Sequence, residues 1–292
     1  MNFPSLKQRI RLALEEDQAF RDITTQQIPA FKGRILRARI VAKAPGIFCG
    51  AFLLKPVFSL LDPKVKIFPL ARDGEKIRKG QILARIKGSA RALMGGERTY
   101  LNFASQLSGI STLTGAFVKA VRGRKVQILD TRKTTPLWRD VEKFAVRCGG
   151  GVNHRMSLGD AILIKDNHLS FLRREKLSLR DFYSQSKLAQ GVRRKIKFVE
   201  LEAKTYADVW EGIKIGADVI MLDNMTLPQI KASLVFIKAA RRALNSKKPA
   251  VEISGGVNLK NVRSFSNLGA ESISVGALTH SVPSLDLSME VD

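Results

Sequence analysis

Residues 218–223 read Asp218-Val-Ile-Met-Leu-Asp223, and residues 250–256 read Ala250-Val-Glu-Ile-Ser-Gly-Gly256. Both are short, β-branched runs that end in polar or glycine residues. Four more apolar or β-branched runs occur after residue 125, at 126–129, 161–164, 196–201 and 272–275. Helix-length stretches separate most of these runs, and repeated strand–helix units build parallel sheets. We therefore expect an α/β barrel or a doubly wound sheet, and we favour a barrel with fewer than eight strands.

The first hundred residues follow a different pattern. A basic amphipathic helix opens the chain, and alternating segments at 34–42 and 65–70 follow it, divided by Gly and Pro. Apolar residues then recur at three- and four-residue steps over 95–120, which predicts a long helix that breaks near Gly109 and bridges two domains. We expect an α+β domain over residues 1–110 and an incomplete barrel over 111–277. The tail at 278–292 is expected to pack back on the first domain.

Composition bounds the function classes. The chain has 45% hydrophobic and 26% charged residues, a globular balance, and its 50 Lys+Arg against 26 Asp+Glu give a net charge of +24. Such a charge attracts nucleic acid, anionic membranes or acidic metabolites. Part of the excess lies between Arg173 and Lys197 without interleaved aromatic residues, so we interpret that segment as solvated surface.

Targeting and redox signals are few. Cys49 and Cys148 are far apart in sequence and offer neither a disulfide framework nor a Cys-x-x-Cys metal site. No run of eighteen apolar residues occurs, and the N-terminus lacks the apolar core of a signal peptide. We expect a cytoplasmic protein that makes no membrane contact.

Polar residues follow the predicted strands repeatedly. Because the loops after parallel strands meet at one end of a barrel, we expect a pocket there. Its candidate residues are Arg132, Lys133, His154, Arg155, Lys165, Glu202, Asp223, Ser254, Gly255, Gly256, Gly276 and Ala277.

The chemistry of these side chains suggests an anionic ligand. Arg132 and Lys133 precede a predicted helix whose dipole disfavours cations, so an external anion would resolve the conflict, although structural ion pairs also occupy such loops. His154 follows glycines and is interpreted as a donor to an anionic substrate, since the three histidines have no zinc-ligand spacing. The glycines at 255, 256 and 276 leave backbone N–H groups open to a phosphate.

Carboxylates add a second function to this predicted pocket. Glu200 and Glu202 lie on the same face of one predicted strand, and Asp223 ends another. They could neutralise the lysines, or bind ribose hydroxyls and a Mg²⁺ ion that carries a diphosphate. The residues alone leave both alternatives open. A phosphorylated sugar is the substrate class that fits all the loops.

Several motifs together resemble the quinolinate phosphoribosyltransferase family. They are Glu97-Arg-Thr-Tyr-Leu-Asn-Phe, Asp130-Thr-Arg-Lys-Thr-Thr-Pro, Gly150-Gly-Val-Asn-His-Arg, Ile164-Lys-Asp-Asn-His, Met221-Leu-Asp-Asn-Met and Ser254-Gly-Gly-Val. The resemblance extends from about residue 10 to 285. It implies an open-faced N-terminal sandwich, an incomplete barrel, and transfer of phosphoribose from 5-phosphoribosyl-1-diphosphate to quinolinate with decarboxylation, giving nicotinate mononucleotide in NAD synthesis.

The resemblance also implies site roles and an assembly. Arg132, Arg155 and Lys165 would hold the two quinolinate carboxylates, with Thr131, Lys133 and His154 beside them. Arg98 would reach in from a neighbouring subunit of a dimer or hexamer. Lys133, Glu202 and Asp223 would face the ribose, the diphosphate and Mg²⁺, with Lys165, Glu202 and Asp223 as the catalytic residues. Ser254, Gly255, Gly256, Val275, Gly276 and Ala277 would hold the 5-phosphate.

Two alternatives remain from the sequence. A related phosphoribosyltransferase, either the type encoded with molybdate transport or one that uses nicotinate, would share the fold and the phosphate loops without needing every quinolinate cation. A nucleic-acid-binding protein on this fold would explain the charge of +24 but not the intact set of site residues. Arg21 stands where the family usually has Gly, at a position outside the predicted site.

Overall fold

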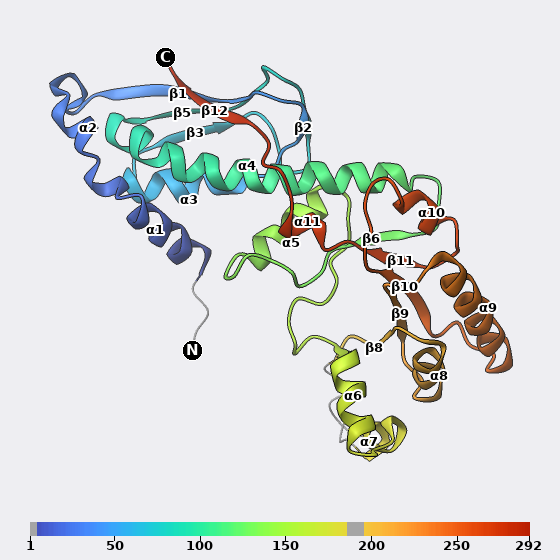
Figure 1. The fold of residues 1–292 in the computed structure, drawn as a ribbon. Coiled ribbons are helices and arrows are strands. Elements are labelled where there is room, and N and C mark those ends of the chain that lie inside the picture. The colour runs from blue at the N-terminus through green and yellow to red at the C-terminus, as the bar shows by residue number, and fades with distance from the viewer. Residues whose placement is uncertain (1–4, 186–195) are drawn as a thin grey trace. The chain divides into compact units, whose positions relative to one another are not determined.

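A computed structural model of the chain describes residues 5–185 and 196–292. The chain divides into two compact units (Figure 1). The first unit runs to residue 115 and also includes residues 141–150 and 281–292, whereas the second contains residues 116–140 and 151–280.

The first unit is built on a four-stranded antiparallel sheet in the order β12-β1-β5-β3, with helices on one face (Figure 1). Its tail strand β12 pairs with β1, so the end of the chain belongs to this unit. Its elements are α1 (Leu6–Glu16), α2 (Ile23–Gln27), β1 (Ile35–Ala42), β2 (Gly46–Ile47), α3 (Ala51–Leu61), β3 (Lys66–Pro69), β4 (Lys76–Ile77), β5 (Ile82–Ser89), α4 (Ala90–Ala120) and β12 (Leu287–Val291), with short 3-10 turns at Ala19–Arg21 and Pro29–Phe31.

Apolar side chains of α3 and α4 pack under the sheet. Phe58 of α3 and Tyr100 of α4 are fully buried, with their rings 5.7 Å apart. The Asp73 carboxylate accepts hydrogen bonds from the backbone N–H groups of Gly50, Ala51 and Phe52, and so satisfies the otherwise unpaired donors at the start of α3.

Helix α4 is continuous over 31 residues, so the expected break at Gly109 is wrong. This glycine serves close packing instead. A Cβ at Gly109 would lie 2.2 Å from the backbone oxygen of Pro283, a separation that no larger residue could adopt. The sequence pattern shows a glycine but cannot distinguish a helix break from a tight crossing.

The second unit is a six-stranded parallel sheet in the order β6-β11-β10-β9-β8-β7. The two edge strands, β6 and β7, are the first two strands of this unit in sequence order, and their pairing is the one that a closed ring would still need. The sheet is therefore the incomplete barrel that the sequence predicts. Its elements are β6 (Gln127–Leu129), β7 (Ile162–Ile164), α6 (Asp166–Arg174), α7 (Leu179–Gln185), β8 (Val199–Ala203), α8 (Tyr206–Lys214), β9 (Val219–Asp223), α9 (Leu227–Ala243), β10 (Ala250–Ser254), α10 (Val262–Ser266), β11 (Ser272–Ser274) and α11 (Ala277–His280). Helix α5 (Arg139–Cys148) follows β6 in the chain, but most of it belongs to the first unit, which includes residues 141–150.

Strand interiors explain why these runs form a barrel. Leu201, Ile220, Ile253 and Ile273 are completely buried, which is the pattern of parallel strands covered on both faces. Helix α8 begins at a capping box in which Thr205 and Asp208 exchange hydrogen bonds. The same carboxylate of Asp208 pairs with Arg173 of α6.

The basic segment between Arg173 and Lys197 falls partly outside the described residues, which stop at 185 and resume at 196. Within the described part, three of its cations form ion pairs: Arg173 with Asp208, Arg174 with Glu175, and Lys197 with Asp160. Throughout the described ranges, no helix combines the length and the apolar character needed to cross a bilayer.

Candidate active site

A cleft of about 620 Å³ lies at the carboxyl ends of the barrel strands. Thirteen of the predicted site residues line it: Thr131, Arg132, Lys133, His154, Arg155, Lys165, Glu202, Asp223, Ser254, Gly255, Gly256, Gly276 and Ala277. Val275 is buried next to this set and is not part of the lining. Arg98 is exposed on α4 in the first unit. Asp223 and Ser254 are the last residues of their strands, and Glu202 is the last but one of its strand. None of the three lies in the loop that follows.

Two guanidinium groups form the cationic wall of the cleft. Burial and the nearby charge of Arg132 lower the pKa of Arg155, so the two like charges repel each other. The Nε atom of Arg132 is buried without a hydrogen-bond partner. Arg155 is fixed in place because one of its terminal nitrogens donates to the backbone oxygen of Ala161 at 2.9 Å. Arg155 is buried and Arg132 is half-buried, so an anion that contacts both would stabilise these mutually repelling cations.

The expected conflict between the cations at residues 132 and 133 and the dipole of the following helix is wrong. Helix α5 begins at Arg139, six positions after Lys133, and Leu137 between them has a left-handed φ of 66°. The field of a helix end falls off within one turn, so it does not act on these cations. The positive charge that acts on Arg132 is that of Arg155, a residue distant in sequence.

Lys133 is held by its backbone. Its N–H donates to Oγ1 of Thr131 at 3.1 Å, and its carbonyl accepts from Oγ1 of Thr279 at 2.6 Å. Gly276 lies next to Lys133. A Cβ added at Gly276 would lie 3.2 Å from the Lys133 side chain. The glycine therefore keeps space between the lysine and the loop that follows β11.

Lys165 and two carboxylates occupy the opposite wall. The ammonium Nζ of Lys165 lies 3.1 Å from a carboxylate oxygen of Glu202, and Asp223 accepts a hydrogen bond from the Asn224 side chain at 2.8 Å. Lys165 is 45% exposed, whereas the Glu202 side chain is only 9% exposed, so the ion pair lies at the edge of the solvent. If an anionic ligand takes Lys165, Glu202 is left as a nearly buried carboxylate that needs another positive partner.

The turn after β10 is shaped for backbone contact with a ligand. Gly255 has φ 92° and Gly256 has φ 61°, both in the left-handed region that favours glycine. A Cβ at Gly255 would lie 2.3 Å from the side-chain oxygen of Asn224, whereas one at Gly256 would meet no atom within 4 Å. Consecutive backbone N–H groups in such a turn form an anion-binding concavity.

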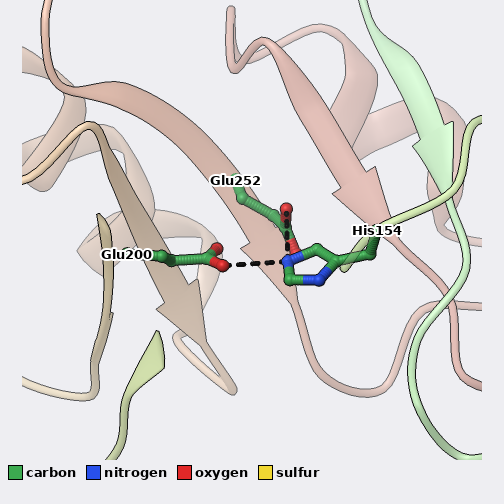
Figure 2. A group of neighbouring side chains, drawn as sticks. All are labelled: His154, Glu200 and Glu252. Atoms are coloured by element: carbon green, nitrogen blue, oxygen red, sulfur yellow. Dashed lines mark hydrogen bonds and ion pairs between the residues drawn. The ribbon is translucent and has the colours of Figure 1, made fainter. Parts of the chain in front are cut away.

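Beneath the cationic wall lies a buried cluster of His154, Glu200 and Glu252 (Figure 2). His154 Nε2 lies 2.8 Å from an oxygen of Glu200 and 3.7 Å from an oxygen of Glu252. Its Nδ1 accepts the backbone N–H of Arg155 at 2.8 Å. A nitrogen that accepts has no proton, so the hydrogen of the ring is on Nε2 and points to Glu200.

Two buried carboxylates next to one histidine need a compensating positive charge, which either a metal ion or a proton can supply. The three side chains each offer a ligand atom within 4.8 Å of the others, which is the spacing of a metal site. However, burial and the charge of Glu200 raise the pKa of Glu252 to about 8. A protonated Glu252 leaves one negative charge in the cluster, and the Nε2 proton of His154 balances it by hydrogen bonding.

His154 faces the cleft, yet both of its ring nitrogens are engaged by the protein. Its loop is fixed further by the buried Asp130, which accepts hydrogen bonds from the side chain of Asn153 at 2.5 Å and from the backbone N–H of His154 at 2.9 Å. Direct donation from His154 to a substrate stays a prediction. In this structure the residue packs against the site and braces Arg155.

Sequence reasoning missed part of the lining. Leu163, Met221, Glu252, Val257, Ser274 and His280 also face the cleft. Glu252 carried a usable signal, because a charged residue in the middle of an apolar strand run is rarely buried without a partner. Leu163, Met221 and Ser274 are small or apolar residues of strands whose inward direction depends on strand register, which sequence spacing does not fix. Val257 and His280 lie outside the strands, and no spacing rule predicts their direction.

Comparison with known proteins places these features in context. Residues 22–108 match the family model of the quinolinate phosphoribosyl transferase N-terminal domain, and residues 110–290 match the model of its C-terminal domain. The chain is 40% identical over 291 residues to a probable nicotinate-nucleotide pyrophosphorylase [carboxylating] of Bacillus subtilis, covering 100% of this chain and 95% of that one. It is 35% identical to the Mycobacterium leprae nicotinate-nucleotide pyrophosphorylase [carboxylating], covering 99% and 98%.

Solved structures agree in fold. The nicotinate-nucleotide pyrophosphorylase of Francisella tularensis superposes with a TM-score of 0.84 at 33% identity, covering 97% of this chain and 95% of that one. The similarity includes both units, since each is matched by its own family model.

Proposed function

This chain belongs to the quinolinate phosphoribosyltransferase family, and we propose that its barrel cleft catalyses the family's reaction of NAD biosynthesis. The reaction transfers phosphoribose from 5-phosphoribosyl-1-diphosphate to the ring nitrogen of quinolinate. Diphosphate and carbon dioxide leave, and nicotinate mononucleotide remains. The observation that carries the proposal is the pair of mutually repelling guanidiniums, Arg132 and Arg155, which faces carboxylates across one cleft.

Quinolinate binding follows from the cationic wall. The substrate has two carboxylates on adjacent ring carbons, and two guanidiniums plus Lys165 can hold both. Neither guanidinium forms an ion pair with a carboxylate in the described part of the chain. The charges of Glu200 and Asp160 act on Arg155 without forming an ion pair with it, so each quinolinate carboxylate would meet a guanidinium that no described carboxylate of the protein occupies.

The phosphoribosyl donor fits the remaining two walls. The left-handed turn at Gly255 and Gly256, with Gly276 on the next strand, would hold the 5-phosphate through backbone N–H groups. Glu202 and Asp223 would face the ribose, where their negative charge stabilises the positive charge that develops on the anomeric carbon as diphosphate leaves.

Magnesium fits the same carboxylates. Mg²⁺ prefers oxygen ligands and is usually held by one or two carboxylates together with substrate phosphates and water, and Glu202 and Asp223 supply that donor set. When bound, the ion would neutralise charge on the departing diphosphate. Lys133, fixed through its backbone by Thr131 and Thr279, would add a cation next to the same leaving group.

Decarboxylation then needs little from the protein. Attack by the ring nitrogen gives a cationic pyridinium, and the adjacent carbon–carboxylate bond breaks with its electron pair left on that ring carbon. The neighbouring positive nitrogen stabilises this ylide, which takes a proton from water. Lys165 would hold the departing carboxylate in place until the bond breaks.

Assembly and location complete the proposal. We infer that the enzyme acts as a homodimer or a hexamer of dimers in the cytoplasm, and that the exposed Arg98 of one subunit enters the cleft of its neighbour. A third guanidinium from outside the barrel would close the carboxylate pocket against water.

One assay tests the function. Purified protein is incubated with Mg²⁺, the phosphoribosyl donor and either quinolinate or nicotinate, and nicotinate mononucleotide and carbon dioxide are measured. We expect product with quinolinate and equimolar carbon dioxide. Turnover with nicotinate in place of quinolinate would assign the cleft to the related activity instead.

A further inference from the structure

The free face of the four-stranded sheet in the first unit is strongly cationic. Helices cover its other face, as Figure 1 shows. The outward positions on β1, β5 and β3 are occupied almost entirely by long basic side chains: Arg37 and Arg39, Arg85 and Lys87, and Lys66. All are exposed or half-exposed. The catalytic proposal uses none of these residues.

The cations are arranged in rows across the strands. Arg37 is directly opposite Lys87, and Lys87 is directly opposite Lys66, so three cations cross three strands in one row. Arg39 and Arg85 form a second row next to it. Directly opposed side chains on a sheet lie about 5 Å apart at Cβ, and like charges at that distance destabilise the sheet. The arrangement is costly unless an anion covers it.

Acidic residues neutralise only one cation of these rows, Arg39. Glu290 and Asp292 lie at the β12 edge, where they pair with Arg39 and Lys43. Among the residues that the structure describes, Arg37, Lys66, Arg85 and Lys87 form no ion pair. These four side chains therefore present unpaired positive charges to the solvent.

A groove extends the rows at one end of the sheet. It has a volume of about 590 Å³, and its lining includes Lys64, Lys66, Lys87 and Arg91. Its one carboxylate, Asp62, already accepts backbone N–H groups of Lys64 and Ser89. The groove therefore continues the cationic surface beyond the strands.

Apolar side chains accompany the cations. Phe68 is 52% exposed and stands directly opposite Arg85, and Ile35 is 55% exposed at the start of β1. An exposed aromatic ring among cations on an open sheet is the arrangement on which single-stranded nucleic acid stacks its bases. Double-stranded nucleic acid would use the charges but not the ring.

We propose that this face binds single-stranded nucleic acid, with phosphates on the two cationic rows and in the groove, and a base stacked on Phe68. A small anion would need only one or two of these cations, whereas they extend over three strands and a groove. The net charge of +24, which the reaction does not require, gives the long-range attraction such a partner needs. The proposal is independent of the proposed catalytic function.

The test measures binding of a fluorescent 20-residue oligouridine to the full-length protein by anisotropy over a range of salt concentrations. The test variant carries Arg37→Gln, Lys66→Gln and Lys87→Gln. Its matched control removes three exposed cations of α9, with Lys231→Gln, Lys238→Gln and Arg242→Gln. Both variants have the same net charge, so only the position of the lost charges differs.

We expect the test variant to bind at least about tenfold more weakly and to lose roughly two units from the slope of log affinity against log salt, since single strands lose about 0.7 per neutralised phosphate. The control should retain most of the affinity and slope. Phe68→Ala should weaken binding by roughly tenfold with the slope unchanged. Unaltered quinolinate turnover would show that the variants are folded.

Four outcomes would overturn the proposal: equal losses in both triple variants, no binding by the wild-type protein, tighter binding of a duplex of equal length, or preferential binding of vesicles rich in phosphatidylserine. Light scattering adds a fifth, because a smaller assembly in the test variant alone would identify the face as a contact between copies of this chain.

Discussion

His154 and Glu200 are joined by a hydrogen bond of 2.8 Å from Nε2 to a buried carboxylate oxygen. Because Nδ1 of the same ring accepts the backbone N–H of Arg155, the bond to Glu200 fixes the tautomer of His154 and the direction of the loop that carries Arg155. A buried acid on β8 therefore positions a cation that contacts substrate in the proposed reaction.

Glu200→Ala should raise the KM for quinolinate by tenfold or more, because the loop at 154–155 loses its brace. Glu200→Gln keeps an acceptor for Nε2 and should raise it much less. Steady-state kinetics with each substrate varied in turn measure both effects. A rise confined to the phosphoribosyl donor would contradict this role.

Glu252 predicts how stability depends on pH. Burial and the charge of Glu200 raise its pKa from 4.5 to about 8, so between these values the folded state keeps a proton that the unfolded state has released. The free energy of unfolding should therefore fall as pH rises from about 4.5 to about 8, by at most about 1.4 kcal/mol per pH unit for this group, and level off above.

Urea unfolding of the wild type and of Glu252→Gln from pH 5 to 9 measures what this carboxyl group, together with its effect on the adjacent Glu200 and His154, contributes to the pH dependence. The difference between the two free energies should change steadily with pH. Parallel curves would mean that Glu252 is ionised in the folded protein.

Arg132→Gln should lower kcat/KM for quinolinate by roughly 30- to 5,000-fold, equivalent to about 2–5 kcal/mol, since it removes one partner of a desolvated charge pair with the substrate. The same substitution at the exposed Arg122 serves as control and should have little effect. Arg132→Lys should recover only part of the activity, because an ammonium cannot make the paired hydrogen bonds of a guanidinium. Full recovery would argue against bidentate binding.

Gly255→Ala should impair binding of the phosphoribosyl donor while leaving quinolinate binding near normal. The added methyl group would lie 2.3 Å from the Asn224 oxygen and would require a left-handed φ of 92°. Gly123→Ala, at a φ of 84° with no atom within 4 Å of the new Cβ, controls for backbone strain alone. Calorimetric titration of each substrate into the two variants distinguishes the steps.

Arg98→Ala and Lys165→Ala should each abolish turnover, and a mixture of the two should regain partial activity if each cleft draws Arg98 from a neighbouring subunit. In such a mixture some clefts combine an intact barrel with an intact Arg98. Subunit exchange is followed by energy transfer between labelled copies. Exchange without recovered activity would rule out the shared site.

The sequence by itself determined the parallel strand repeats of the second unit, the incomplete barrel, and the residues that line its cleft. Apolar runs must be buried, and the ends of parallel strands must meet at one edge, so spacing alone locates Arg132, Lys165 and Asp223. The motifs also indicated the family, because each is a contiguous stretch that can be recognised without the fold.

Only the tertiary structure decided how those residues act on one another. The repulsion of Arg132 and Arg155, the fixed tautomer of His154 and the raised pKa of Glu252 each depend on side chains that are far apart in the sequence and close in the fold. Gly109 shows the same limit, since its role depends on the backbone of Pro283, far away in the chain. Hydrophobic pattern is a local property of a sequence, whereas electrostatics and close packing depend on which distant residues fold against each other.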